Sequence, residues 1–267
     1  MKIRVPSLLL LFLIGIYSHR VVAARVPSGD AKAVALASQS LASLTGKIAI
    51  SDVTLTGTVE WNGTDTGNGV FKALGIDESR VDMNLSAGRH SEIRDAQTGK
   101  PSGQWSSDAQ AAKAMPSQNC QTDPVWFFPA LSSLGGRQNR VLRYIGQETR
   151  NDVTVEHIRS YANNPKLPTE VASRVEALTA VDFYLDANTL LPVALSFNIH
   201  PDNDNNTDIL TEVEFSDYQD NNGVKIPMRI RKYMQGNLLF DFRVSNVVLN
   251  IGLGNSDFAL TATQGGR

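Results

Sequence analysis

The last third of the chain alternates apolar and polar residues with a period of two. Five successive runs between Val181 and Val248, one of them weaker than the rest, carry an apolar side chain at every second position. Successive side chains of a β-strand point to opposite faces, so this pattern is typical of strands with one dry and one solvated face. The positions predicted on the dry face are Val181, Phe183, Leu185, Leu191, Val193, Leu195, Phe197, Ile199, Ile209, Thr211, Val213, Phe215, Val224, Ile226, Met228, Ile230, Leu238, Phe240, Phe242, Val244 and Val248.

The connections between these runs are short and rich in turn-forming residues. Asp, Asn, Gly and Pro dominate the breaks at 186–188, 201–206, 220–223 and 236–237. Strands joined by so few residues run antiparallel, because a parallel connection needs about a dozen residues or more. The pattern therefore predicts an antiparallel meander.

The first two thirds of the chain add strands and helical pieces to this meander. Ala31–Leu44 is predicted to be a helix, with Ser28 or Asp30 as its cap and Gly46 as its end. The whole pattern gives about eleven strands in an antiparallel all-β or α+β domain with one core. The remaining predicted elements are strands at Ile48–Trp61, Gly69–Leu74, Arg80–Leu85, His90–Ile93, Val141–Gln147 and Val153–Tyr161, the beginning of a strand at Gln104–Trp105, and a turn of helix at Thr169–Val175.

One segment interrupts the strand pattern with the densest group of large apolar side chains after the N-terminal region. Asp123-Pro124 is a helix start signal, but Pro129 argues against one continuous helix because it lacks a backbone donor. We predict a short turn followed by a helix from Pro129 to Leu134. The group is either plain core that closes one mouth of the sheet, or the lining or lid of an apolar ligand cavity. Its members are Trp126, Phe127, Phe128, Leu131 and Leu134.

The N-terminus has the three parts of a secretory signal. Lys2 and Arg4 supply positive charge, an apolar stretch follows at 8–16, and Val22-Ala23-Ala24 offers a cleavage site after Ala24. The apolar stretch is too short to span a bilayer as an anchor. We therefore predict a signal peptide at 1–24, a single domain at 25–260 and a flexible tail at 261–267, in an exported protein of the periplasm or cell envelope, possible secretion included.

Charge and cysteine content narrow the classes of partner. Removal of 1–24 leaves 22 basic and 27 acidic residues, a formal charge of −5. Such a chain has no general attraction for nucleic acid or anionic lipid surfaces, so no nucleic-acid partner and no second membrane segment are predicted. Cys120 is the single cysteine, and one cysteine makes no internal disulfide. It is a nucleophile, an intermolecular bridge or a chance loop thiol, with the last favoured.

The residues that carry chemistry form no catalytic or metal-binding motif. His90, His157 and His200 lack the spacing of zinc ligands. The alternating acids from Asp202 fail as a calcium loop, because Thr207 stands at the glycine position of that loop. There is no nucleophile elbow, phosphate loop or dinucleotide fingerprint. We therefore predict no catalytic residue, no metal and no cofactor.

The last third resembles a known group of exported bacterial proteins. Val181–Val193 is a strand, a turn and a returning strand with a proline near its start, and Phe215–Pro227 follows with Asp-Asn-Asn-Gly at its turn. Together with a final strand that leads to Phe258, this succession is similar to the LolA/LolB-like lipoprotein-carrier half-barrel superfamily. The resemblance implies a mainly β (α+β) fold, namely a strongly curved open antiparallel sheet with a few short helices over its concave face.

Three hypotheses about function follow. The resemblance implies a binding protein that carries or senses an apolar acyl-chain or lipid-like ligand in a half-barrel cavity. The alternative on the same fold is a non-enzymatic module that binds an envelope protein partner, for example as a stress sensor, because an open sheet edge accepts a partner strand. The third is a hydrolase with dispersed residues, which a cleft joining His157 or His200 to a carboxylate and a hydroxyl would favour.

Overall fold

The structure is a computed structural model that describes residues 28–96, 101–122, 125–128 and 140–260. The predicted signal peptide and the predicted tail lie outside these residues, so both stay predictions. The predicted helix at Pro129–Leu134 lies outside them as well.

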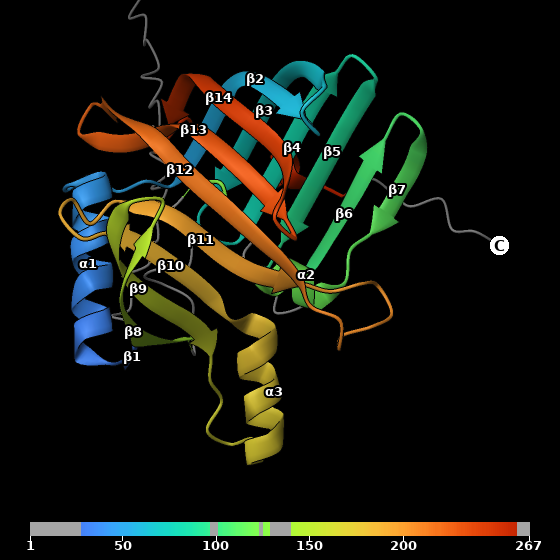
Figure 1. Cartoon of the computed structure of the whole chain (residues 1–267). Coiled ribbons are helices and arrows are strands. Elements are labelled where there is room, and N and C mark those ends of the chain that lie inside the picture. Colours follow the sequence, from blue (N-terminus) through green and yellow to red (C-terminus); the bar gives the residue numbers. More distant parts are fainter. Residues whose placement is uncertain (1–27, 97–100, 123–124, 129–139, 261–267) are drawn as a thin grey trace, which may run out of the picture.

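Fourteen strands form one sheet in the order β1-β8-β9-β10-β11-β12-β13-β14-β2-β3-β4-β5-β6-β7 (Figure 1). Neighbouring strands are antiparallel except at one edge, where β1 pairs in parallel with β8. The strands are β1 (Ser28–Gly29), β2 (Asp52–Trp61), β3 (Asp65–Leu74), β4 (Glu78–Leu85), β5 (Gly88–Asp95), β6 (Ser102–Ser107), β7 (Gln110–Ala114), β8 (Arg140–Arg150), β9 (Val153–Ala162), β10 (Val181–Asp186), β11 (Pro192–Ile199), β12 (Ile209–Asn221), β13 (Val224–Met234) and β14 (Asn237–Leu249).

The predicted mainly β antiparallel fold is confirmed, but the predicted count of about eleven strands was low. β1 and β7 were not predicted, and of β6 the sequence predicted only a beginning at Gln104–Trp105. β1 has two residues, which is too few to show a period. β7 reads Gln-Ala-Ala-Lys-Ala and contains no β-branched or aromatic residue, so composition gives no strand signal there.

Within the described residues, three α-helices and one 3-10 helix accompany the sheet: α1 (Ala31–Thr45), α2 (Ser117–Thr122), α3 (Thr169–Thr179) and η1 (Asn255–Phe258). The Asp30 carboxylate accepts a hydrogen bond from the Lys32 backbone N–H at 2.8 Å, which confirms one of the two predicted caps of α1. Gly46 ends α1 at a φ of 58°. No helix among the described residues has the length and apolar content needed to cross a membrane.

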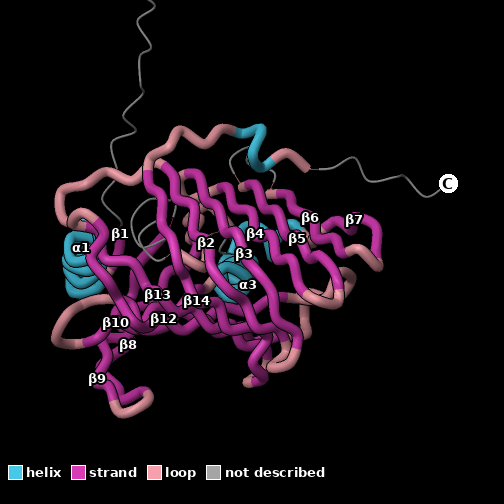
Figure 2. Tube along the Cα trace, turned by 90° about the horizontal axis from the view of Figure 1, so that it is seen from above, coloured by secondary structure: helices cyan, strands magenta, loops and turns pink. Residues whose placement is uncertain are grey.

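The sheet bends strongly round its inner face, which is the face that carries the main core. Helix α2 contacts both β6 and β11, although seven strands lie between these two in the sheet. In a flat sheet such strands would be about 38 Å apart, whereas a helix of six residues is about 9 Å long. Helix α1 likewise lies against β8 and β13. The result is an open half-barrel, whose bend Figure 2 shows from above.

The core confirms the period-two prediction for β10–β14. Phe183, Leu195, Val213, Ile230 and Phe242 are buried in one cluster together with Leu36 and Ala37 of α1.

The prediction fails at three register shifts. On β14, Leu239, Val247 and Leu249 pack against the main core, so the predicted places of Leu238 and Val248 on the dry face were wrong. On β11, the register shifts opposite Leu185. Val193 consequently packs in a separate small cluster with Val155, Tyr184 and Ala194, so its predicted place on the dry face was wrong.

Candidate functional site

The inner face is filled by large aromatic side chains that come from distant parts of the chain. Trp126 and Phe127 lie edge-on to Phe71 of β3, with ring centroids 6.0 and 5.4 Å away. Phe71 stacks on Phe242 of β14 at 4.1 Å. Trp126 lies 5.6 Å from Phe240. We call this set the inner aromatic cluster: Trp61, Phe71, Trp126, Phe127, Phe240 and Phe242.

The segment Val125–Phe128, here called the plug, supplies the centre of this cluster. It belongs to no strand or helix and forms a single turn, in which the Phe128 N–H donates to the Val125 carbonyl at 3.3 Å. Its four side chains are almost completely buried. The structure therefore brings together three of the five predicted site residues, Trp126, Phe127 and Phe128, whereas Leu131 and Leu134 lie outside the described residues.

The inner face also holds charged side chains, here called the inner ionic cluster: Glu92, Arg94 and Lys232. Arg94 Nη2 lies 2.6 Å from a Glu92 carboxylate oxygen. Lys232 Nζ lies 4.1 Å above the centre of the Trp126 ring, a cation–π contact. Burial alone would raise the pKa of Glu92, but the charges of Arg94 and Lys232 and the facing Trp126 indole outweigh it and lower that pKa.

Strand pairing explains how these charges reach the interior. On β5, Glu92 lies opposite Val81, and Arg94 lies opposite Ser79. Residues directly opposite one another share a face, so both charged side chains point inward with Val81. On β13, Lys232 lies opposite Val213 and Phe240, which belong to the main core.

The sequence analysis did not single out any of the three charged residues. For Lys232 the signal was present, because Lys232 continues the period of Val224, Ile226, Met228 and Ile230 by one more step. On β5, the apolar Ile93 suggests that Ile93 points inward and that Glu92 and Arg94 point outward, which is the opposite of what the structure has. The 3-10 helix η1 contacts the outer side of β4 and β5 and buries Phe258 there, which gives Ile93 a dry place outside the barrel.

Three buried polar atoms on the inner side have no hydrogen-bond partner of good geometry among the described residues: Ser40 Oγ of α1, Thr211 Oγ1 of β12 and Trp126 Nε1. Ser40 and Thr211 are 0% exposed, and Trp126 is 1% exposed. Buried polar groups are nearly always paired in folded proteins, so each such atom needs an explanation. Thr211 lies opposite Phe197 and Met234, diagonally next to Lys232.

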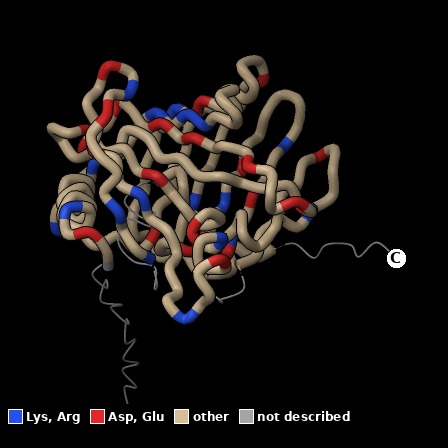
Figure 3. The backbone as a smooth tube through the Cα atoms, turned by 60° about the horizontal axis from the view of Figure 1, so that its bottom comes forward, with Lys and Arg blue, Asp and Glu red and all other residues tan. Residues whose placement is uncertain are grey.

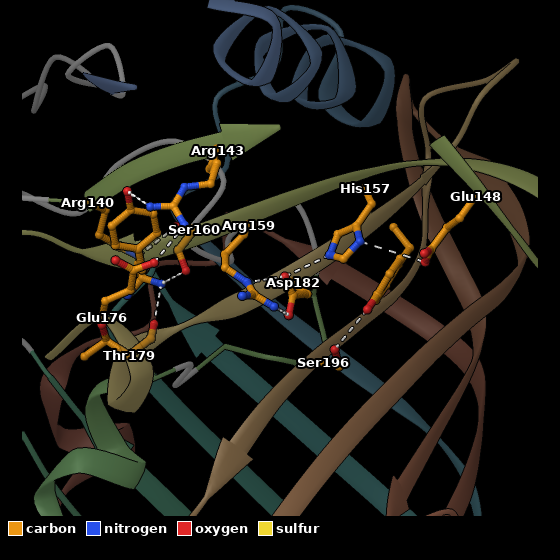
Figure 4. Close-up of polar contacts among 12 residues, drawn as sticks. Arg140, Arg143, Glu148, His157, Arg159, Ser160, Glu176, Thr179, Asp182 and Ser196 are labelled. Atoms are coloured by element: carbon orange, nitrogen blue, oxygen red, sulfur yellow. Dashed lines mark hydrogen bonds and ion pairs between the residues drawn. The ribbon is translucent and has the colours of Figure 1, made fainter. Parts of the chain in front are cut away.

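A second polar group lies on the outer face of β9–β11, and Figure 4 shows its members. His157 Nε2 lies 2.8 Å from Asp182 Oδ1, and Arg159 donates to the same carboxylate with two hydrogen bonds of 2.8 Å. Burial alone would raise the pKa of Asp182, but these hydrogen bonds from His157 and Arg159 outweigh it and lower the pKa. A hollow of about 350 Å³, lined by Asp182 and Ser196 among others, adjoins the group.

This group does not have the geometry of a hydrolytic triad. Both ring nitrogens of His157 face carboxylates, because Nδ1 lies 3.9 Å from Glu148. The Ser196 hydroxyl lies 3.4 Å from the Tyr184 hydroxyl. A general base needs a free nitrogen within reach of its nucleophile. The contacts instead link β8–β11, and Arg140 ties the end of α3 to β9 by hydrogen bonds to the Thr179 and Ser160 carbonyl oxygens.

Two other sequence candidates have structural roles. Cys120 is buried in α2, and burial raises the pKa of its thiol to about 11. At neutral pH the side chain is therefore a protonated thiol, which is a poor nucleophile. In the acidic hairpin, Asp204 accepts hydrogen bonds from the Asn206 N–H and the Thr207 hydroxyl, which is turn chemistry. Among the described residues, no three His, Cys, Asp or Glu side chains group as metal ligands.

A bent open sheet with an aromatic, helix-covered concave face is the architecture of a half-barrel. No family model and no curated protein matches the chain. Among solved structures, it is similar to a domain named for outer-membrane lipoprotein sorting from Vibrio parahaemolyticus, at 14% identity, a TM-score of 0.53, and coverage of 84% of this chain and 94% of that one. A LolA superfamily protein from Nitrosomonas europaea is similar at 9% identity and a TM-score of 0.48, with 85% and 97% covered. The chain has a LolA-like fold, as its sequence resemblance predicted.

Proposed function

We propose that this chain is an exported, non-enzymatic binding protein that carries or senses an apolar acyl-chain or lipid-like ligand inside the half-barrel. The observation that carries the proposal is the plug. Aromatic side chains fill the interior from a segment outside the regular structure, whereas the walls of the interior belong to the hydrogen-bonded sheet. A ligand can take the place of the plug without breaking the sheet.

The free-energy balance of such an exchange supports the proposal. Withdrawing Trp126, Phe127 and Phe128 exposes apolar surface on the plug and on its seat, and a bound acyl chain covers the seat again. Since the hydrophobic effect is non-directional and scales with buried area, an acyl chain replaces aromatic rings at modest net cost. In this proposal Trp126, Phe127, Phe128, Leu131 and Leu134 face the ligand, and 1–24 directs export.

The second candidate function is a protein–protein module, and the open edge at β7 is the observation in its favour. β7 is the last strand of the sheet and pairs on one side only. Its side chains are mostly exposed. Lys113 stands on this edge, however, and charged edge residues are a common device against strand addition. The carrier function is therefore the better supported of the two.

Binding of a fluorescent fatty acid to the mature chain, residues 25–267, tests the carrier function. We expect saturable binding at micromolar concentration with quenching of tryptophan emission, because Trp61 and Trp126 lie in the interior. Absence of saturable binding by the folded wild type contradicts the proposal.

A matched pair of variants separates the plug from ordinary core. Phe127→Ala loosens the plug, so it should tighten probe binding by about threefold to tenfold, because less free energy is spent on displacing the plug. Val155→Ala removes buried carbons from the small separate cluster with Tyr184 and Ala194 instead, and it should lower the melting temperature with little change in affinity per folded molecule. Equal affinities for wild type and Phe127→Ala argue against displacement of the plug.

A further inference from the structure

Resting on the proposed function, we infer that the inner ionic cluster is a head-group site, and that the ligand is an amphiphile with one acyl chain region and an anionic carboxylate or phosphate head. The inference starts from the position of Lys232. This side chain is 6% exposed and occupies a row of core residues that runs from Leu195 through Val213 to Phe240. Enclosing an ammonium group in such a row costs free energy unless it is compensated.

The present surroundings of Lys232 depend on the plug. Its Nζ lies on the face of the Trp126 ring, and Trp126 leaves this position if the plug is displaced. Glu92 stays with Arg94, since these two residues share one strand and their side chains are 2.6 Å apart. Displacement of the plug therefore removes one partner of Lys232 and opens the place beside it to the incoming ligand.

Most groups around that place are hydrogen-bond donors, and the Glu92 carboxylate beside them is held by Arg94 at 2.6 Å. An ammonium and a guanidinium group donate and never accept, and the Thr211 hydroxyl can donate as well. Thr211 Oγ1 is fully buried, has no hydrogen-bond partner among the described residues and lies diagonally next to Lys232 on the neighbouring strand. An oxygen-rich anion matches this set, because it accepts several hydrogen bonds and carries the charge that offsets Lys232. The two cations and one carboxylate of the inner ionic cluster carry a net positive charge, which disfavours a cationic head, and a plain hydrocarbon offers the donors no further acceptor.

The arrangement also orients the ligand. The inner ionic cluster contacts the inner aromatic cluster through Trp126, whereas the apolar walls of β10–β13 and α1 extend away from it along the inner face. A ligand with its head at Lys232 therefore has its chain along Phe183, Leu195 and Ile230. In this arrangement, the charged end of the site recognises the head group, and the apolar remainder buries the acyl chain without further specificity.

The test compares the affinities of dodecanoate, dodecyl phosphate and dodecanol for the mature chain at pH 8, by displacement of a neutral fluorescent probe. Wild type should bind both anions at least tenfold more tightly than the alcohol. Lys232→Met should lower this anion-to-alcohol preference about tenfold, the size of effect typical of one lost charge-assisted hydrogen bond. The preference is the ratio of the affinity for an anion to the affinity for the alcohol. Any loosening of the plug changes both affinities by the same factor and therefore cancels. The phosphate and carboxylate arms identify which head the site prefers.

Two variants serve as controls. Lys225→Met changes a lysine of the same strand that is ion-paired with Asp220 at 3.1 Å on the exposed side, and it should leave the preference unchanged. Lys232→Arg should restore it, since guanidinium also donates to anions. If Lys232→Met keeps the wild-type preference while all three compounds bind, the head-group inference is wrong and the carrier function stands. If wild type binds none of the three, the carrier function itself is contradicted.

Discussion

The two faces of β10–β14 show two ways in which one sheet handles charge. On the outer face, cations and anions form pairs across neighbouring strands: Arg159 with Asp182, Arg231 with Glu214, and Arg229 with Asp241. Figure 3 shows basic and acidic residues interspersed along the chain. On the inner face, the partners of Lys232 come from β5 and from the plug. Outer charges are matched by strand register, whereas the inner ones depend on the bend of the sheet and on the plug, which belongs to no strand or helix.

The two faces therefore differ in how far the partners of each charged residue are separated along the chain. The outer pairs are local, because each one joins side chains of neighbouring strands. The inner ionic cluster is enclosed and, together with Trp126, comes from three distant segments. In the function proposed above, a change in any one of these segments alters what the interior binds. The predictions below test this contrast, beginning with the largest effect.

Phe197→Asp should destabilise the fold by about 3–5 kcal/mol, because it places a carboxylate in the apolar wall next to Thr211. The adjacent Asn198→Ser changes the solvated face and should cost less than about 0.5 kcal/mol. Urea unfolding of the two variants gives the comparison directly. Similar midpoints for both would mean that the two faces are not distinct.

Asp182→Asn tests the outer network. It leaves His157 and Arg159 without their shared carboxylate and should cost about 1–2 kcal/mol at pH 7. The folded-state pKa of Asp182 lies below its ordinary value of 3.8. The ionised carboxylate therefore contributes stability above that value, and this contribution is lost as the pH falls through the folded-state pKa. The gap between wild type and variant in unfolding free energy should narrow below pH 4, and a gap that stays constant down to pH 2 would argue against the assignment.

Glu78→Gln tests the effect of acidic residues that lie close together at one end of β4 and β5, where Glu78 is near Asp77 and Asp95. Burial, then repulsion from Asp95 and Asp77, raises the pKa of Glu78 to about 7. Its ionisation is therefore disfavoured in the folded state, and wild-type stability should fall as the pH rises from 4.5, its ordinary pKa, to about 7. The variant lacks this loss and should be more stable than wild type at pH 8 by about 1 kcal/mol after allowance for solvent screening. Thermal melts at pH 4 and pH 8 measure it, and an equal offset at both values contradicts the raised pKa.

The elements that could be predicted from the sequence are those whose own residues determine them. The runs of β10–β14 alternate over enough positions to predict the strands and most of their faces, except at the register shifts of β11 and β14. Helix α1 carries its cap at Asp30 and its end at Gly46. The inward turn of Glu92 and Arg94 was not predictable in this way. It depends on Phe258, far along the chain, which makes a dry place for Ile93 outside the barrel. Helix α2, six polar residues long, likewise forms by bridging strands that come together only when the sheet bends.

Trp126, Phe127 and Phe128 show the same limit at the candidate site. Their apolar character was sufficient to predict that they would be buried, and their position in no regular element fitted the predicted turn. The lysine beneath Trp126 was recognisable only once β13 was known to continue past Arg231 with its alternation intact. The period-two hydrophobic pattern thus predicts the apolar residues of a buried face more readily than the charged residues among them.

Native mass spectrometry of the chain, produced with its leader in a bacterial host and purified from the cell envelope without detergent, is the strictest test of the proposed carrier function and of its ligand class. We expect a folded protein of the mass expected for residues 25–267 together with a second species, heavier by one acyl-chain amphiphile that organic extraction releases and that carries a carboxylate or phosphate. Folded protein at its bare mass alone, even after incubation with excess dodecanoate or dodecyl phosphate, would contradict the proposed carrier function.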